Sequence, residues 1–129
     1  MGTPGTGKTT WAEEAGKILG WPVKNERSLL RDHPSLFRRD RITREDVVDT
    51  PKWAPLLRKE WKTLKRPFVG EGHLFCEMRL PAGGIIVLTC ARPELERRLR
   101  GRGYSELKIE ENLYCEDIHY SLAKVRTNY

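Results

Sequence analysis

A glycine-rich run at the start of the chain constrains the fold more than any other feature. Residues 2–9, Gly-Thr-Pro-Gly-Thr-Gly-Lys-Thr, match the phosphate-loop pattern GxxxxGK[ST] at every position. Glycines let the backbone curl so that its N–H groups face phosphate oxygens, and the helix that follows adds its positive N-terminal dipole. A turn that merely starts a helix does not need Lys followed by Thr, so we interpret the run as a phosphate-binding loop. Lys8 would then bridge the outer phosphates, and Thr9 would place its hydroxyl on Mg²⁺.

A second candidate site follows a short apolar run in the middle of the chain. Phe68-Val-Gly ends at Glu71-Gly-His73, where a phosphate-loop enzyme holds the acid that orders Mg²⁺ and water. Glu71 is the candidate for that role. His73 lies two residues on, on the same side of an extended segment, and is placed to orient water or a phosphate oxygen. Taken alone, Glu-x-His is typical of an exposed strand end without a function, and the upstream loop favours the functional interpretation.

Four arginines lie within six residues near position 100. They repel one another unless acids or polyanions lie between them. We interpret Arg97 and Arg100 as a solvated helix end whose cations suit the C-terminal dipole. Arg98 and Arg102 are one turn apart and lie beside glycines, which favours a phosphate clamp.

Hydrophobic spacing predicts helices that alternate with short strands. Helices are expected at 8–19, 50–64, 93–100 and 105–125, and strands at 68–70 and 84–90. The second strand is continuously apolar, as in a strand buried on both faces. Residues 43–46 have capping-box spacing, and 24–41 read as exposed and irregular or short-helical. This order predicts an α/β fold with a parallel sheet, and 129 residues suit one domain.

The phosphate loop raises an expectation about the sheet. Such a loop hangs from the end of a buried parallel strand, and only Met1 precedes Gly2. We therefore expect that strand to be missing or to be replaced by another segment.

Charge and composition narrow the classes of partner. The 24 Lys and Arg against 18 Asp and Glu leave a net charge of +6, which favours nucleotides, RNA or acidic surfaces without choosing among them. The apolar run 85–88 is far too short to cross a bilayer, and no signal peptide is recognised. Three widely spaced cysteines indicate neither a disulfide framework nor a zinc site. We expect no membrane partner and a cytoplasmic location, with the nucleus as the alternative in a eukaryote.

Together these residues resemble the adenylate kinase 6 family, small kinases whose members also assist maturation of the small ribosomal subunit. Residues 2–10 match its phosphate loop, 47–49 its helix after the monophosphate segment, and 71–73 its acidic-x-His element. The run 102–112, Arg-Gly-Tyr-Ser-Glu-Leu-Lys-Ile-Glu-Glu-Asn, followed by Cys115-Glu116, resembles its lid and the next helix. This run is the most specific, because it separates the family from shikimate, cytidylate and gluconate kinases.

The resemblance implies a three-layer P-loop NTPase fold of the nucleoside monophosphate kinase type. Residues 1–129 would form one kinase domain, in which 25–49 bind the monophosphate and 101–111 form the lid. Relative to the family, the first strand and the closing strand and helix are missing. Ser28 stands where the family tends to carry an acid.

The resemblance also implies a reaction and its groups. ATP would donate its γ-phosphate to a nucleoside monophosphate, typically AMP, with slow ATPase activity and with Mg²⁺ as the metal. By position, the phosphates of ATP would be held by Gly5, Gly7, Lys8, Thr9, Thr10 and the lid arginine Arg102. The catalytic set would be Lys8, Glu71, His73 and Arg102, with Thr9 and Glu71 at the metal.

The resemblance further implies contact with a small-subunit ribosomal protein and with pre-ribosomal RNA. An alternative function is therefore an ATP-gated ribosome assembly factor, whose hydrolysis drives release and whose kinase turnover is insignificant. A third reading is an incomplete chain that binds anions weakly. Only the kinase strictly needs a competent acceptor segment around 31–41.

Overall fold

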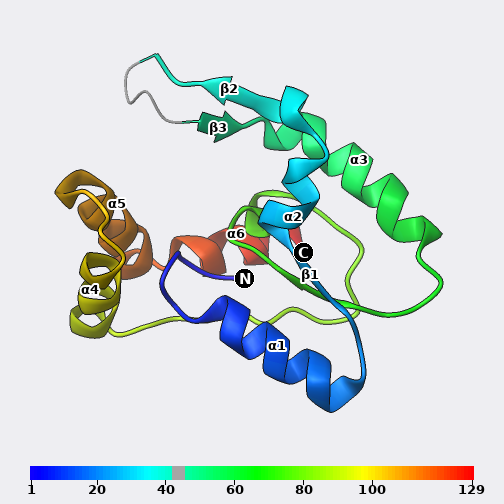
Figure 1. Ribbon diagram of the computed structural model, residues 1–129, viewed down its shortest axis with the longest axis horizontal. Coiled ribbons are helices and arrows are strands. Elements are labelled where there is room, and N and C mark those ends of the chain that lie inside the picture. The colour runs from blue at the N-terminus through cyan, green and yellow to red at the C-terminus, as the bar shows by residue number, and fades with distance from the viewer. Residues whose placement is uncertain (42–45) are drawn as a thin grey trace.

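The computed structural model describes residues 1–41 and 46–129, and most of the expected capping box at 43–46 lies outside them. Helices and short strands alternate along the described chain (Figure 1). In order they are α1 (Lys8–Leu19), β1 (Val23–Asn25), α2 (Glu26–Arg31), the 3-10 helix η1 (Pro34–Leu36), β2 (Phe37–Arg39), β3 (Asp46–Val48), α3 (Thr50–Thr63), β4 (Val69–Glu71), the 3-10 helix η2 (Leu74–Glu77), α4 (Arg92–Gly101), α5 (Glu106–Asp117) and α6 (Tyr120–Asn128).

A pair of parallel strands confirms the α/β class. β1 and β4 run parallel, and their register sets Asn25 beside Glu71 at the carboxyl ends of both strands. α1 packs on this pair through a face of small residues, because Ala12 and Gly16 are buried. A Cβ on Gly16 would lie 2.8 Å from a methyl of Val23, so the helix approaches the strand closely. The phosphate loop at the start of α1 is thereby placed next to the end of β4.

The prediction of a strand buried on both faces at 84–90 is wrong. The segment is extended, but among the described residues its backbone ladder is limited to two bonds with Met1: the terminal amino group donates to Ile86 O at 2.7 Å, and Leu88 N donates to Met1 O at 2.9 Å. A strand needs a partner along its length, and one residue supplies a single parallel bridge. Ile86 is accordingly 73% exposed. Met1 thus stands where the first strand of the sheet was expected.

The helices at 8–19, 50–64 and 93–100 are confirmed within a residue or two. The single helix predicted at 105–125 is divided instead into α5 and α6, because His119 adopts a left-handed φ of 51°. The turn lets α6 lie against η2, where Asn128 Nδ2 donates to Cys76 O at 2.7 Å and Tyr129 OH donates to Phe75 O at 3.1 Å. Tertiary contacts therefore override a continuous helical pattern.

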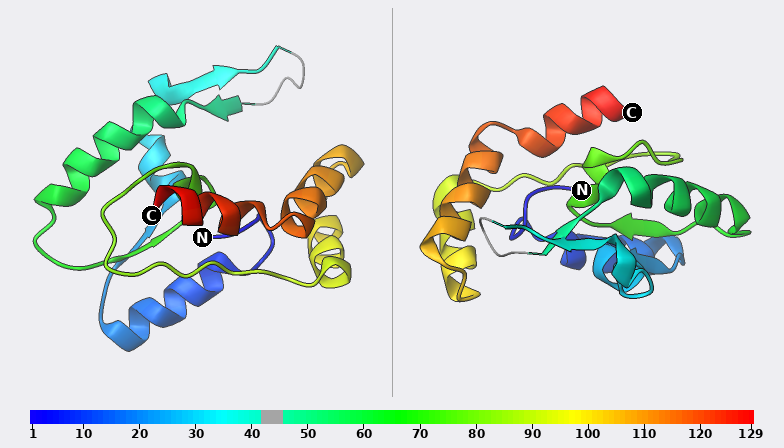
Figure 2. Two further views of the ribbon diagram at one scale, coloured as in Figure 1. Left: turned by 180° about the vertical axis from the view of Figure 1, so that it is seen from behind. Right: turned by 90° about the horizontal axis from the view of Figure 1, so that it is seen from above.

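The segment 24–41, expected to be irregular or short-helical, contains the short helices α2 and η1, and it also contributes β2, the first strand of a β-hairpin. β2 and β3 pair antiparallel, with Phe37 opposite Val48 and Arg39 opposite Asp46. The hairpin lies at the N-terminal end of α3 and extends away from the parallel strands (Figures 1 and 2).

Two apolar clusters form the interior. The larger joins α2, α3 and η2 and includes Leu30, Leu36, Trp53, Ala54, Leu57, Phe75, Met78 and Leu80. The smaller joins α4 to α5 through Leu95, Leu99, Ile109 and Leu113. The α4–α5 pair lies to one side of the remaining helices in both views of Figure 2. Among the described residues, no helix has the length and apolar character needed to cross a membrane.

Candidate functional site

A cleft of about 1160 Å³ is lined by all the residues that the sequence analysis proposed for catalysis and for binding ATP and metal. We call it the main cleft; it is bordered by the phosphate loop, α2, the hairpin, the turn after β4 and α5. The predicted residues along it are Gly5, Gly7, Lys8, Thr9, Thr10, Glu71, His73 and Arg102. Residues far apart in the sequence are thus brought together around one hollow, as with Lys8 and Glu71.

The phosphate loop needs glycine at two of its positions. Gly5 and Gly7 have φ values of 95° and 93°, a region that side-chain-bearing residues rarely adopt. Gly5 also approaches α4 closely, because a Cβ there would lie 2.8 Å from Leu95 Cδ1. The loop is therefore shaped by its own glycines and supported by the smaller apolar cluster.

Lys8 points back into the loop that it follows. Its Nζ donates to Thr3 O at 3.0 Å. Burial lowers the pKa of Lys8 below its usual value, while the carboxylates of Glu71 and Glu26 act in the opposite direction. An ammonium group held beside the loop is available to phosphates that bind there.

Thr9 and Glu71 are in contact, and this contact favours a metal site. The Thr9 hydroxyl donates to Glu71 Oε1 at 3.1 Å, and the side-chain amide of Asn25 donates to the same oxygen. Donation uses the hydroxyl hydrogen and leaves the oxygen lone pairs of Thr9 free to accept or to ligate. Glu71 is buried beside it. Hydroxyl and carboxylate oxygens are donors that Mg²⁺ prefers when it also takes phosphate and water ligands, so the residues present suit that metal.

His73 is held by a carboxylate that the sequence analysis missed. Its Nδ1 lies 2.8 Å from Oε1 of Glu26, the first residue of α2. The other oxygen, Oε2, accepts from Leu74 N at 2.7 Å. The turn from Glu71 to Leu74 is therefore fixed to α2 by one buried side chain.

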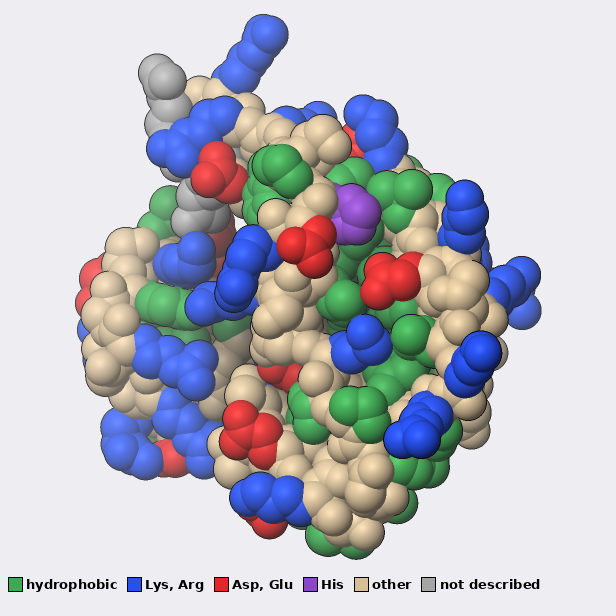
Figure 3. All heavy atoms as spheres, turned by 45° about the vertical axis from the view of Figure 1, so that its right-hand side comes forward, with side chains coloured by type: hydrophobic (Ala, Val, Ile, Leu, Met, Phe, Trp, Pro, Cys, Tyr) green, Lys and Arg blue, Asp and Glu red, His purple; other side chains and the backbone are tan. Residues whose placement is uncertain are grey.

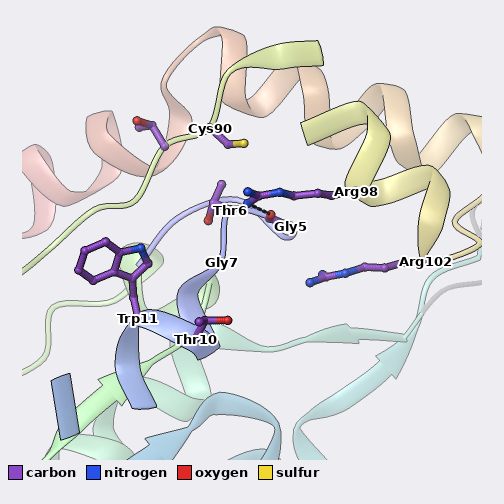
Figure 4. Close-up of a pocket in the computed structure, with 9 residues that line it drawn as sticks. Gly5, Thr6, Gly7, Thr10, Trp11, Cys90, Arg98 and Arg102 are labelled. Atoms are coloured by element: carbon purple, nitrogen blue, oxygen red, sulfur yellow. Dashed lines mark hydrogen bonds between the residues drawn. The ribbon is translucent and has the colours of Figure 1, made fainter. Parts of the chain in front are cut away.

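The arginines at the end of α4 make different contacts. Arg97 binds Glu94, and Arg100 binds Glu96 and Glu106, all on the exposed side of the helix. Arg98 also pairs with Glu94 at 2.7 Å, and it lies against the phosphate loop, where its Nη1 donates to Gly5 O at 3.2 Å (Figure 4).

Arg102 caps the C-terminus of α4 and points toward the phosphate loop (Figure 4). It borders the main cleft and lies close enough to contribute to the lowered pKa of Lys8. Within the part of the chain that the structure describes, no ion pair engages Arg102. Its guanidinium is thus available to an anion in the cleft.

A smaller hollow of about 480 Å³ lies on the other side of the loop. We call it the side pocket; Figure 4 shows Trp11 and Thr10 on one side of it and Arg98 and Arg102 on the other. Trp11 lies on the solvent side of α1 and is 66% exposed. The buried face of α1 is formed instead by Ala12 and Gly16.

Three residues that the sequence analysis did not select bind the residues of the site. They differ in how far the sequence could have indicated them. Asn25 follows from the parallel register once β1 is paired with β4. Glu116 lies in the run that resembles the family; buried on α5, it accepts from the Thr3 hydroxyl and from Cys90 N. No sequence pattern pointed to Glu26.

Comparison with known proteins agrees with this geometry. A family model described as an AAA domain matches residues 1–119. The adenylate kinase isoenzyme 6 homolog of Caenorhabditis elegans is 30% identical over 131 residues, which cover 99% of this chain and 71% of that protein. A protein of Thermococcus onnurineus named "Putative adenylate kinase" is 32% identical over 117 residues, which cover 89% of this chain and 60% of that protein.

The chain therefore spans about 60% to 71% of the length of these two relatives. The matched region contains the phosphate loop, Glu71-Gly-His73 and the run that begins at Arg102. On the family match and on the C. elegans relative, the chain belongs to the adenylate kinase 6 family of small P-loop kinases.

Proposed function

We propose that the protein is a nucleoside monophosphate kinase that transfers the γ-phosphate of ATP to an acceptor, with AMP as the first candidate. The contact between the Thr9 hydroxyl and the Glu71 carboxylate, beside Lys8 in the main cleft, carries this proposal. A phosphate loop joined to an acid at the end of a parallel strand is the arrangement by which P-loop enzymes hold Mg²⁺ and the phosphates.

The donor phosphates would lie against the loop. Backbone N–H groups at the start of α1 donate to them, and Lys8 neutralises their outer charge. Thr9 and Glu71 would hold Mg²⁺, which when bound offsets charge on the phosphate oxygens. Arg102 would stabilise the charge that develops on the transferred group.

The acceptor would enter on the side of α2 and the hairpin. Arg27 and Arg31 are exposed on α2, and both border the main cleft. Guanidinium groups suit a monophosphate because their forked donors match its oxygens. The cleft, at about 1160 Å³, exceeds the roughly 300–1,000 Å³ usual for one small ligand, which suits two nucleotides.

Residues 101–111 would act as the lid over the transferred phosphate. They comprise the end of α4, the turn at 103–105 and the first half of α5. Tyr104 and Lys108 border the cleft from this segment. Closure would exclude water and so favour transfer over hydrolysis.

The test is a coupled assay of purified protein with Mg·ATP, which compares ADP formation without acceptor and with AMP, CMP, GMP or UMP. We expect strong stimulation by AMP, with a second ADP formed from the acceptor. Lys8→Ala should abolish ATP binding and turnover, and Glu71→Gln should keep binding but lose most turnover. Lys17→Ala is the matched control, because Lys17 lies on exposed α1 and pairs with Glu14. Unchanged ATP affinity in Lys8→Ala would overturn the assignment.

A second candidate is an ATP-gated assembly factor that contacts a small-subunit ribosomal protein and pre-ribosomal RNA. The net charge of +6 and the Lys and Arg side chains spread over the face in Figure 3 favour it. Acceptor-independent ADP release in the same assay would support this function over the kinase. RNA binding that weakens steeply with salt would support the ribosomal role, and its absence would count against that role.

A further inference from the structure

Glu26 is a buried carboxylate at the bottom of the main cleft, and no reaction step uses it so far. It is 5% exposed and begins α2, directly after Asn25. Burial of a charge is costly unless its hydrogen bonds are made inside the protein. Glu26 accepts one such hydrogen bond from Leu74 N, and its other oxygen lies close to Nδ1 of the adjacent His73.

An ionised carboxylate only accepts hydrogen bonds. Leu74 N donates to Oε2 at 2.7 Å. A backbone N–H can only donate, so Oε2 must be the acceptor in this bond. Oε1 lies 2.8 Å from Nδ1 of His73. The lone pairs of a carboxylate oxygen and of a bare ring nitrogen would repel at this separation, which favours a hydrogen on Nδ1. The neutral imidazole therefore carries its proton on Nδ1 and presents the lone pair of Nε2.

We infer that Glu26 is a positioning residue that fixes the tautomer and orientation of His73 in the kinase site. The inference rests on the proposed function and goes beyond it, because it assigns to Glu26 the choice between an accepting and a donating imidazole. His73 borders the main cleft with its side chain 47% exposed, so Nε2 is accessible to water or to a ligand hydroxyl.

The neighbouring glycine shows how closely the carboxylate is seated. A Cβ on Gly72 would lie 2.2 Å from Glu26 Oε2 and 2.7 Å from its Cβ. Gly72 has no unusual φ, so its lack of a side chain matters for space alone. Glycine at position 72 thus lets the carboxylate reach both Leu74 N and His73 across the turn.

The substitution Glu26→Gln provides the sharpest test, because it changes one contact and retains the other. With its amide oxygen on Leu74 N, the introduced glutamine must turn its NH₂ toward Nδ1 of His73. Nδ1 then has to accept, so the proton moves to Nε2. A merely structural role for Glu26 would not move this proton.

The first measurement uses ¹⁵N-histidine-labelled protein and long-range ¹H–¹⁵N spectra at a pH where the imidazole is neutral. His73→Gln identifies the His73 signals among the three histidines. We expect an Nδ1–H tautomer in the unsubstituted protein and an Nε2–H tautomer in Glu26→Gln. An Nε2–H tautomer of His73 in the unsubstituted protein would overturn the inference without requiring Glu26→Gln to fold or any turnover to occur.

The second measurement is the split between kcat and KM in the coupled assay. Glu26→Gln should lower kcat by about tenfold, a loss typical of groups that orient a functional side chain, with KM for ATP unchanged. Glu14→Gln, an exposed substitution on α1, is the matched control and should change neither quantity. An unchanged tautomer and kcat in Glu26→Gln would reject the role of Glu26 alone, whereas loss of all transfer in the unsubstituted protein would reject the proposed function.

Discussion

At the scale of single residues, three buried glutamates organise the main cleft. Glu26, Glu71 and Glu116 are 5%, 5% and 8% exposed. Glu71 binds the Thr9 hydroxyl, Glu116 binds the Thr3 hydroxyl, and Glu26 binds the turn that follows β4. Buried carboxylates with satisfied oxygens fix the groups around them. The phosphate loop is therefore held at both of its ends by acids from distant parts of the chain.

Arg102→Ala should lower the rate of phosphoryl transfer by about tenfold or more, because a guanidinium aimed at the loop is removed from the developing charge. Single-turnover kinetics with Mg·ATP and AMP would measure the change. Arg97→Ala is the control, since Arg97 belongs to the same helix, faces solvent and pairs with Glu94. A change confined to thermal stability in Arg102→Ala would contradict a role of Arg102 in the transfer and would place it with Arg97 and Arg100 as part of a solvated helix end.

Cys76 should resist alkylation at pH 8. Burial raises the pKa of its thiol to about 11, and a raised pKa favours the neutral thiol at every pH below that value. The reactive thiolate is therefore scarce at pH 8 and increases as the pH approaches 11. Peptide mass spectrometry after iodoacetamide treatment at pH 8 and pH 10 would test this. Rapid, complete labelling of Cys76 at pH 8 in folded protein would contradict the expectation.

At the scale of elements, the helices around the phosphate loop bury faces of different kinds. α1 has Trp11 and Ile18 on its solvent side, at 66% and 83% exposure, while Ala12 and Gly16 face the parallel strands. The α4–α5 pair instead buries large side chains and supports the loop, because Leu95 and Leu99 both lie next to Gly5. The phosphate loop consequently depends on α4 as well as on α1.

Leu99→Ala should destabilise the protein by about 2–5 kcal/mol, the usual cost of a cavity at a fully buried leucine. Leu99 is fully buried in the smaller cluster. Urea unfolding followed by circular dichroism would give the free energy of unfolding. Leu107→Ala on α5 is the control, because Leu107 is exposed and should change stability by less than about 0.5 kcal/mol. Equal effects of the two substitutions would contradict the assigned core.

At the scale of the whole molecule, the site lies between the two apolar clusters. The larger cluster supports β4 and the turn at Glu71, and the smaller supports Gly5 and α5. Contacts that cross between them include the bond from the Thr3 hydroxyl to Glu116. A ligand that binds the phosphate loop and Glu71 at once therefore ties the two parts of the fold together.

Mg·ATP at about one hundred times its Kd should stabilise the folded state by about 2.7 kcal/mol, because it binds the native chain and not the unfolded one. Differential scanning calorimetry should show a rise of several degrees in Tm. Lys8→Ala should abolish the rise, and Lys17→Ala should retain it. A rise that persists in Lys8→Ala would place the nucleotide away from the phosphate loop.

Local sequence determined the elements whose signals lie within a few residues. The glycines of the loop, the helix that follows and the start of α3 at Thr50-Pro51 were predictable, since sterics and hydrogen bonding of neighbouring residues set them. Local patterns also indicated Glu71, Arg98 and Arg102 as candidate site residues. The contacts that these residues make did not.

Only the tertiary structure decided the remainder, because it depends on pairing between distant segments. Residues 84–90 have the composition of a strand, but a strand requires a neighbour, and Met1 supplies a single bridge. The helix break at His119 comes from the docking of α6 on η2, and the hairpin from the pairing of Phe37 with Val48. Glu26 meets His73 because the parallel register of β1 and β4 brings the start of α2 to the turn after Glu71, a proximity that no local pattern encodes.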